Sequence, residues 1–197
     1  MSVTFASPPA ASVDALKQAF EEHAHAFASQ AEAQGGGDFS EPEQRMPHPI
    51  YTSTLQDAAA GAAVRHAKIV AWRYVAGIGD NVRTAEVNID PKGGGHSFAS
   101  LNFGPHGASL LHALGGLGSS GEGAQDKDAE VRVLRLPALK VEALWLHSAG
   151  GADQIVPLAP SHFDSDPETS FTVPQFEAAL VERAKSLLGG DSETGGG

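Results

Sequence analysis

The stretch EVRVLRLPALKVEALWLHSAGGADQIVPLAP, residues 130–160, decides the fold. Apolar and polar side chains alternate up to Pro137 and again over 141–147, which is the period of β-strands. A glycine pair then turns the chain. The last run is predicted to be an edge strand, because Pro157 has no N–H to donate to a ladder. We interpret residues 136–160 as core strands first and as part of a site second.

Three further strands are predicted upstream of this stretch. The segment 63–76, AVRHAKIVAWRYVA, alternates and is followed by a glycine-bearing turn. The segment 84–90 reads as its return strand, and 96–104 as the next strand after the turn PKGGG. Strands joined by short turns favour a meander. The expectation is a mostly antiparallel sheet of about five or six strands.

Helices are predicted at both ends of the sequence. Apolar residues recur at three- and four-residue steps over 13–33, with Ser12 as N-cap: Val13, Leu16, Phe20, Ala24, Phe27 and Ala31. Near the C-terminus, Thr172 and Gln175 have capping-box spacing ahead of a second stripe: Phe176, Ala179, Leu180, Ala184 and Leu187. A short helix ended by Gly115 is expected after Pro105. The fold class is α+β, with the N-terminal and C-terminal helices packed on one face of the sheet.

Length and composition indicate one domain. A chain of 197 residues is compatible with a single core. The expected division is a flexible N-terminus at 1–12, a single α+β domain at 13–188 and a disordered tail at 189–197. Within the domain, the glycine-, acid- and proline-rich segment 35–49 is expected to be an irregular linker.

The charge excludes some partners. A net charge of −11 and an isoelectric point near 5.1 oppose binding to nucleic acid and to anionic membranes. The absence of cysteine excludes disulfides and thiolate chemistry. The sequence shows neither the pattern of a signal peptide nor an apolar run long enough to span a membrane. A cytoplasmic location is therefore predicted.

Familiar catalytic and metal-binding motifs are not recognised. Nine histidines are present, but His23 and His25 are two apart on a predicted helix and cannot chelate one ion there. His96, with His106 and His112, is the best metal or acid/base guess, although polar loop residues explain it more simply. The acidic run 164–168 lacks the later residues of a calcium loop, and no phosphate loop or nucleophile elbow occurs. We predict no catalytic residue, no metal site and no cofactor.

Aromatic residues on strands give the one ligand-binding hypothesis. Such aromatics could line a small-molecule pocket with His147 near Trp145, and Arg73 or Arg135 would orient the ligand. The aromatic residues on predicted strands are Trp72, Tyr74, Phe98, Phe103 and Trp145. A packed core accounts for the same positions and is the simpler interpretation.

Two functions follow from these patterns. The first is a non-catalytic binding or assembly module of unknown partner, with a protein or a second copy bound through amphipathic helices such as 13–33. The alternative is a small-molecule-binding protein or enzyme with a pocket near Trp72 and Trp145, in which His147 or His96 acts as acid or base.

Overall fold

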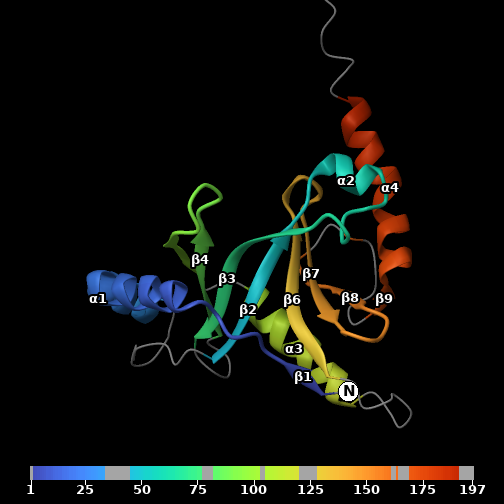
Figure 1. Cartoon of the computed structure of the whole chain (residues 1–197). Helices are drawn as coiled ribbons and strands as arrows, with labels where there is room; N and C mark the ends of the chain where they lie inside the picture. Colours follow the sequence, from blue (N-terminus) through green and yellow to red (C-terminus); the bar gives the residue numbers. More distant parts are fainter. Residues whose placement is uncertain are drawn as a thin grey trace, which may run out of the picture.

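The computed structural model describes residues 2–33, 45–76, 82–102, 105–119, 128–160, 163 and 169–190. These residues form a nine-stranded mixed sheet with four α-helices (Figure 1). The strands are β1 Val3–Thr4, β2 Arg45–Thr52, β3 Lys68–Ala76, β4 Arg83–Ile89, β5 His96–Asn102, β6 Ala129–Leu136, β7 Val141–His147, β8 Gln154–Pro157 and β9 Phe171–Thr172. The helices are α1 Ala10–Ala33, α2 Leu55–Ala59, α3 Pro105–Ser119 and α4 Val173–Gly190, with a 3-10 turn at Pro137–Leu139.

The sheet joins two antiparallel halves through one parallel contact. Its order is β5-β4-β3-β2-β6-β7-β8-β9, and β1 pairs alongside β6. One half is β5-β4-β3-β2 and the other is β6-β7-β8-β9, and all neighbouring strands within each half are antiparallel. The two halves meet where β2 runs parallel to β6, in a ladder that begins with Ile50 opposite Val133. The α+β class and the mostly antiparallel sheet are thus confirmed. The sheet has more strands than expected because β1, β2 and β9 were not recognised in the sequence.

Strand register assigns each side chain to one of two faces. We call one the α1/α4 face, which carries Trp72, Leu134 and Trp145, and the other the α3 face, which carries Arg73 and Leu144. Figure 1 shows α1 and α4 at opposite ends of the sheet, with α3 behind β6. The prediction that the N- and C-terminal helices pack on one face is confirmed.

Each helix buries its own apolar stripe against the sheet. Leu16, Phe20 and Phe27 of α1 pack with Trp72, Tyr74, Ala85 and Val87. Phe176, Leu180 and Ala184 of α4 pack with Leu134, Ala143, Trp145 and Ile155. On the other face, Leu110 and Ala113 of α3 pack with Val75, Val131, Leu144 and Leu146. The apolar residues of α1 therefore serve the protein's own core.

The observed helix boundaries differ from those predicted from the sequence. The first helix begins at Ala10, so Ser12 is not its N-cap; Ser12 lies fully buried inside α1 and accepts a 2.8 Å hydrogen bond from the Tyr74 hydroxyl. Ala24, Ala179 and Leu187 are exposed rather than buried. Gly115 does not end α3. The Thr172 N–H does donate to the Gln175 side chain, at 2.9 Å, which is half of the predicted capping box.

The segments flanking the predicted strands are also more regular than expected. β2 begins at Arg45, so residues 45–49 of the expected linker belong to a strand, and 35–44 lie outside the described residues. The strand predicted at 63–76 begins only at Lys68, after α2 and a turn. At the N-terminus, β1 pairs with β6 within the segment expected to be flexible. No helix in the described ranges is long and apolar enough to cross a membrane.

Candidate functional site

An aromatic and polar cluster occupies the α1/α4 face where β2, β6 and β7 lie side by side. We call Tyr51, Arg132, Trp145, His147 and Asp153 the Trp145 cluster. The Arg132 guanidinium carbon lies 4.9 Å from the centroid of the Trp145 ring and 5.3 Å from that of Tyr51. The two rings are 5.2 Å apart at 66°. Cation–π contact with two rings holds the guanidinium in a defined position.

Strand register explains why these residues meet. Arg132 of β6 pairs directly with Trp145 of β7, which places both on the α1/α4 face. Tyr51 of β2 joins them through the parallel β2–β6 contact, since it pairs with Leu134, the next residue of β6 on that face. His147 follows Trp145 by two residues and therefore points to the same side.

Asp153, in the turn between β7 and β8, fixes the polar side of the cluster. Its carboxylate accepts hydrogen bonds from Trp145 Nε1 at 2.7 Å, from His147 Nδ1 at 3.0 Å and from the Ser148 N–H at 3.0 Å. Burial raises the pKa of Asp153, but the hydrogen bonds from His147, Ser148 and Trp145 outweigh burial and lower it. An ionised carboxylate only accepts hydrogen bonds, so Nδ1 of His147 is the donor, and Nε2 is on the opposite side of the ring, away from Asp153.

The cluster is partly open and has little net charge. The side chain of His147 is 35% exposed and that of Arg132 is 16% exposed. Arg132 Nε donates to Glu130 Oε1 at 2.6 Å. One guanidinium therefore faces two carboxylates, those of Glu130 and Asp153, beside the His147 imidazole. This balance suits a neutral or cationic group and disfavours an anion.

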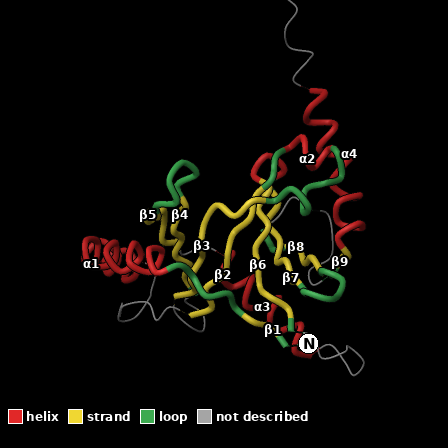
Figure 2. Tube along the Cα trace, in the orientation of Figure 1, coloured by secondary structure: helices red, strands yellow, loops and turns green. Residues whose placement is uncertain are grey.

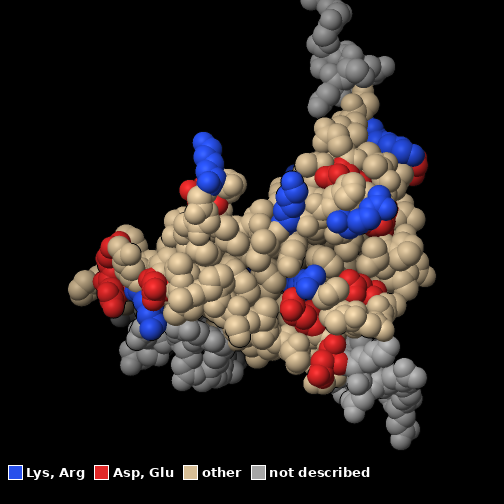
Figure 3. All heavy atoms as spheres, in the orientation of Figure 1, with Lys and Arg blue, Asp and Glu red and all other residues tan. Residues whose placement is uncertain are grey.

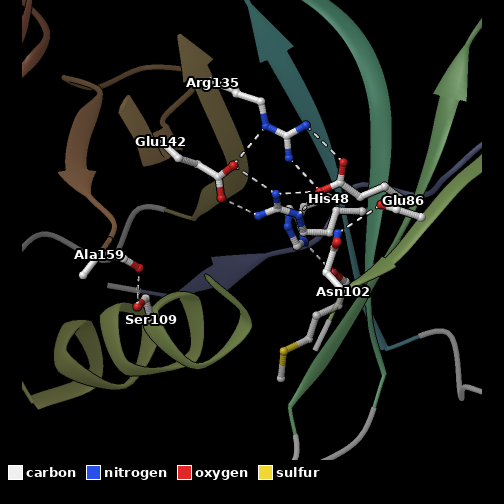
Figure 4. Close-up of polar contacts among 10 residues, drawn as sticks. His48, Glu86, Asn102, Ser109, Arg135, Glu142 and Ala159 are labelled. Carbon is white, nitrogen blue, oxygen red and sulfur yellow. Dashed lines mark hydrogen bonds and ion pairs between the residues drawn. The ribbon is translucent and has the colours of Figure 1, made fainter. Parts of the chain in front are cut away.

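A buried network of four charged side chains crosses the α3 face (Figure 4). We call Arg73, Glu86, Arg135 and Glu142 the arginine–glutamate network. Arg73 is 2% exposed; it donates to Glu86 Oε1 at 2.7 Å and to Glu142 Oε1 at 2.7 Å. Arg135 donates to the same two residues, at 2.6 Å to Glu86 Oε1 and 3.0 Å to Glu142 Oε2. Two guanidinium groups therefore neutralise two carboxylates that come from β4 and β7.

The network keeps both carboxylates ionised. Burial raises the pKa of Glu142, but hydrogen bonds and positive charge from Arg73 and Arg135 outweigh it and bring that pKa down to about 2. The pKa of Glu86 is lowered in the same balance between burial and the two arginines. Carboxylates held in this way are poor general acids near neutral pH.

His48 lies beside the network and is completely buried. It pairs across the β2–β3 ladder with Arg73, and its Nδ1 donates to the Met46 carbonyl at 2.7 Å. Its Nε2 has no hydrogen-bond partner among the described residues. Burial and the positive charge of Arg73 lower the pKa of His48 to about 4. The imidazole is thus neutral at physiological pH.

The predicted ligand-binding residues fall into three places. Trp145 and His147 meet in the Trp145 cluster, with ring centroids 6.0 Å apart. Trp72 and Tyr74 lie together under α1, in a different part of the core. Arg73 is on the opposite face, inside the arginine–glutamate network. The structure therefore does not gather the five residues at one point.

Sequence reasoning missed Tyr51, Arg132 and Asp153. Arg132 had a signal, because its distance from the turn at 137–140 places it opposite Trp145 in a β-hairpin. Tyr51 had none, since it reaches β6 through a parallel pairing far along the chain.

Elsewhere in the described part of the chain, histidines and acidic residues meet at most in pairs, such as His66 with Asp57 at 2.8 Å. Within the described ranges, no group of three or more His, Asp or Glu side chains is arranged to hold a metal ion. His23, His25 and His112 are exposed on their helices, and both ring nitrogens of His96 are buried with no hydrogen-bond partner in the part of the chain described. The acidic run 164–168 and Phe103 lie outside the described residues.

Comparison with protein-family models, with curated proteins and with solved structures gave no match. Function is therefore inferred from the residues of this chain.

Proposed function

We propose that this chain is a non-catalytic module that binds a protein partner through the Trp145 cluster. The observation that carries the proposal is the Arg132 guanidinium, which lies against both the Tyr51 and the Trp145 ring on a partly open sheet face. Trp, Tyr and Arg are the residue types that contribute most to binding energy at protein interfaces. Asp153 fixes the Trp145 ring by its Nε1 hydrogen bond, so little side-chain freedom is lost on binding.

The surroundings of the cluster indicate the chemistry of the partner. On the side shown in Figure 3, charged side chains are scattered and leave broad uncharged areas between α1 and α4. Together with the neighbouring Glu130, the cluster has two carboxylates and one guanidinium, and the whole chain has a net charge of −11. A partner with a neutral or basic contact surface fits this face, and nucleic acid does not. A cytoplasmic location stays a prediction of the sequence.

Site-directed photo-crosslinking in cells tests this proposal. A photoreactive phenylalanine analogue replaces Tyr51 in one version of the chain, and in a control version it replaces Lys185, an exposed residue of α4. We expect one discrete crosslinked protein from position 51 that is absent at position 185 and is lost when Arg132→Gln is added. Equal crosslinking at both positions, or no product at position 51, would contradict the proposal. Thermal unfolding of the Arg132→Gln protein checks that the fold is retained.

A second candidate, small-molecule binding or acid/base catalysis by His147, is favoured by one observation. Asp153 holds His147 through Nδ1 and leaves the lone pair of Nε2 on the outer side of the ring. The chain has two tryptophans, so Trp72→Phe and Trp145→Phe proteins report on one tryptophan each. A metabolite that quenches the fluorescence of the Trp72→Phe protein but not that of the Trp145→Phe protein would support this candidate. Absence of any ligand-induced fluorescence change or thermal shift argues against it.

A further inference from the structure

We infer that β5 is an interface between two copies of this chain, in which the two β5 strands pair edge to edge and each α1 covers the strand of the other copy. This goes beyond the proposed partner surface. β5 is the terminal strand of the sheet, whereas the Trp145 cluster lies on β2, β6 and β7. The two interfaces are therefore independent.

The two ends of the sheet differ in how much backbone they present. β5 has seven residues, and β4 is its only ladder partner among the described strands. At the other end, β9 has only two residues and runs directly into α4. A long outer strand presents a row of N–H and C=O groups that can pair with another chain. Only the β5 end offers such a row.

The sequence of β5 contains few of the features that keep sheet edges apart. Edge strands of monomeric proteins usually carry lysine, proline or an inward-pointing charge. The β5 sequence, HSFASLN, has no Asp, Glu, Lys, Arg or Pro, although 19% of the whole chain is charged. A register shift opposite Glu86 and Val87 is the one irregularity in its ladder. Ser97 and Ala99 are exposed and small, so a neighbouring strand meets no bulky or charged side chain there.

α1 extends past this edge and provides cover for an added strand. Near its start, Ser12 contacts Tyr74 of β3, and further along Phe27 packs on Phe98 of β5 with ring centroids 5.7 Å apart. The helix is oblique, because the fifteen residues from Ser12 to Phe27, about 22 Å of helix, cross only from β3 to β5. It continues six residues further to Ala33, which at this slant is about 4 Å across the strands. A paired strand lies only about 4.8 Å away in the plane of the sheet. Figure 2 shows α1 at the β4–β5 end of the sheet, with its outer part to the side of the strands.

A second copy fits this arrangement better than a single foreign strand. Antiparallel pairing of β5 with β5 creates a two-fold axis perpendicular to the sheet, which keeps both α1 helices on the same face. Each copy then supplies both a strand and a projecting helix, and each projecting helix covers the strand of the other. An isolated foreign strand uses one helix and leaves its own outer edge open.

The negative charge of the chain makes dimer formation depend on salt concentration. The exposed residues Glu21 and Glu22 lie on α1 just before Phe27, and each copy carries a net charge of −11. Copies therefore repel one another at low ionic strength, while the β5 strands contribute no charge to the contact. Since salt screens this repulsion, we expect the dimer to be tighter in about 1 M salt than in about 0.1 M salt.

Sedimentation velocity on the full chain over a concentration series tests the inference. The wild-type protein should form a dimer whose dissociation constant falls as salt rises. Ser97→Lys with Ala99→Lys places two lysines on each edge, and pairing would remove water from four ammonium groups, which should raise the dissociation constant about tenfold or more even in about 1 M salt. The matched control is Ala178→Lys with Ala179→Lys, at exposed positions of α4, which should dimerise like the wild type in about 1 M salt.

Hydrogen exchange gives a second readout that needs no substitution. Amide protons of β5 should exchange more slowly at concentrations where the dimer forms, while those of β9 should not change. A wild-type chain that is monomeric at both salt concentrations would overturn the inference, as would a dimer that survives in the edge variant. Loss of the dimer in the Arg132→Gln protein would also overturn it, because that result would assign self-association to the Trp145 cluster.

Discussion

Acidification should destabilise this protein through His48 before it affects the arginine–glutamate network. The pKa of His48 falls from 6.5 to about 4 in the folded state, because the imidazole is fully buried and faces Arg73. Glu86 and Glu142 partly offset this effect. Between the two pKa values the unfolded chain binds more protons than the folded one. The stability that neutral His48 contributes is therefore complete above about pH 6.5 and is lost as the pH falls towards 4.

The size of this loss follows from the pKa difference of about 2.5 units. At 1.36 kcal/mol per unit, the free energy of unfolding should fall by about 3 kcal/mol across the window. Glu142, with an ordinary value of 4.5 and a folded pKa of about 2, contributes stability that is lost only below pH 4.5. Measurements between pH 7 and pH 4.5 thus isolate the histidine.

Urea unfolding at several pH values measures this dependence directly. The wild type should lose up to about 1.4 kcal/mol per pH unit within the window, which is the slope of one proton. His48→Gln keeps an amide donor for the Met46 carbonyl but does not titrate, so its slope should disappear. His25→Gln, at an exposed position of α1, should keep the wild-type slope. A flat wild-type profile, or an unchanged slope in His48→Gln, would refute the reasoning.

Three further predictions concern buried polar groups, each measured by urea unfolding at pH 7. Glu142→Gln should lower the free energy of unfolding by about 3 kcal/mol, because Arg73 keeps its charge in a buried site. Adding Arg73→Met to this variant should recover part of the lost stability. No recovery would contradict the account of the network. His96→Leu should raise stability by about 1 kcal/mol, because the unpartnered ring nitrogens are removed; a loss of stability would show that they are satisfied. Ser12→Ala should lower the free energy of unfolding by about 1 kcal/mol in the wild type and by much less in a Tyr74→Phe protein. Equal losses in the two proteins would show that the 2.8 Å hydrogen bond contributes no stability.

The strands that were predicted have sequences with a recognisable pattern between turns. Alternation identified β6, in which Val131 and Val133 are buried while Arg132 is only half-buried. The β7 strand is buried on both faces up to Leu146, so its alternation in sequence does not reflect one exposed face. β2 gave no such signal, since Pro47 and Pro49 break the expected pattern. Prolines are tolerated there because the ladder between β2 and β6 begins only at Ile50, after both of them. No local property of the sequence reveals where a second ladder begins.

The site was predictable only where its members are close in sequence. Trp145 and His147 were placed together by their spacing of two in one strand, and the structure brings them together. Arg73 was expected to orient a ligand, but its guanidinium is bonded to two glutamates. One of these, Glu142, lies 69 residues away on a strand that does not neighbour β3. Such a pairing depends on strand order, which alternation does not encode.

The arginine–glutamate network also accounts for how this sheet keeps its register. Ile50, Ala71 and Val133 form a small buried row on the α3 face, and Arg73 lies one step further along that face from Ala71. Because side chains alternate, a slip of one residue in the pairing of β3 would turn Arg73 towards the apolar core under α1. An unpaired buried charge costs several kcal/mol, which is comparable to the whole stability of a domain. The network therefore excludes the slipped pairing, even though its ion pairs add little net stability over an apolar core.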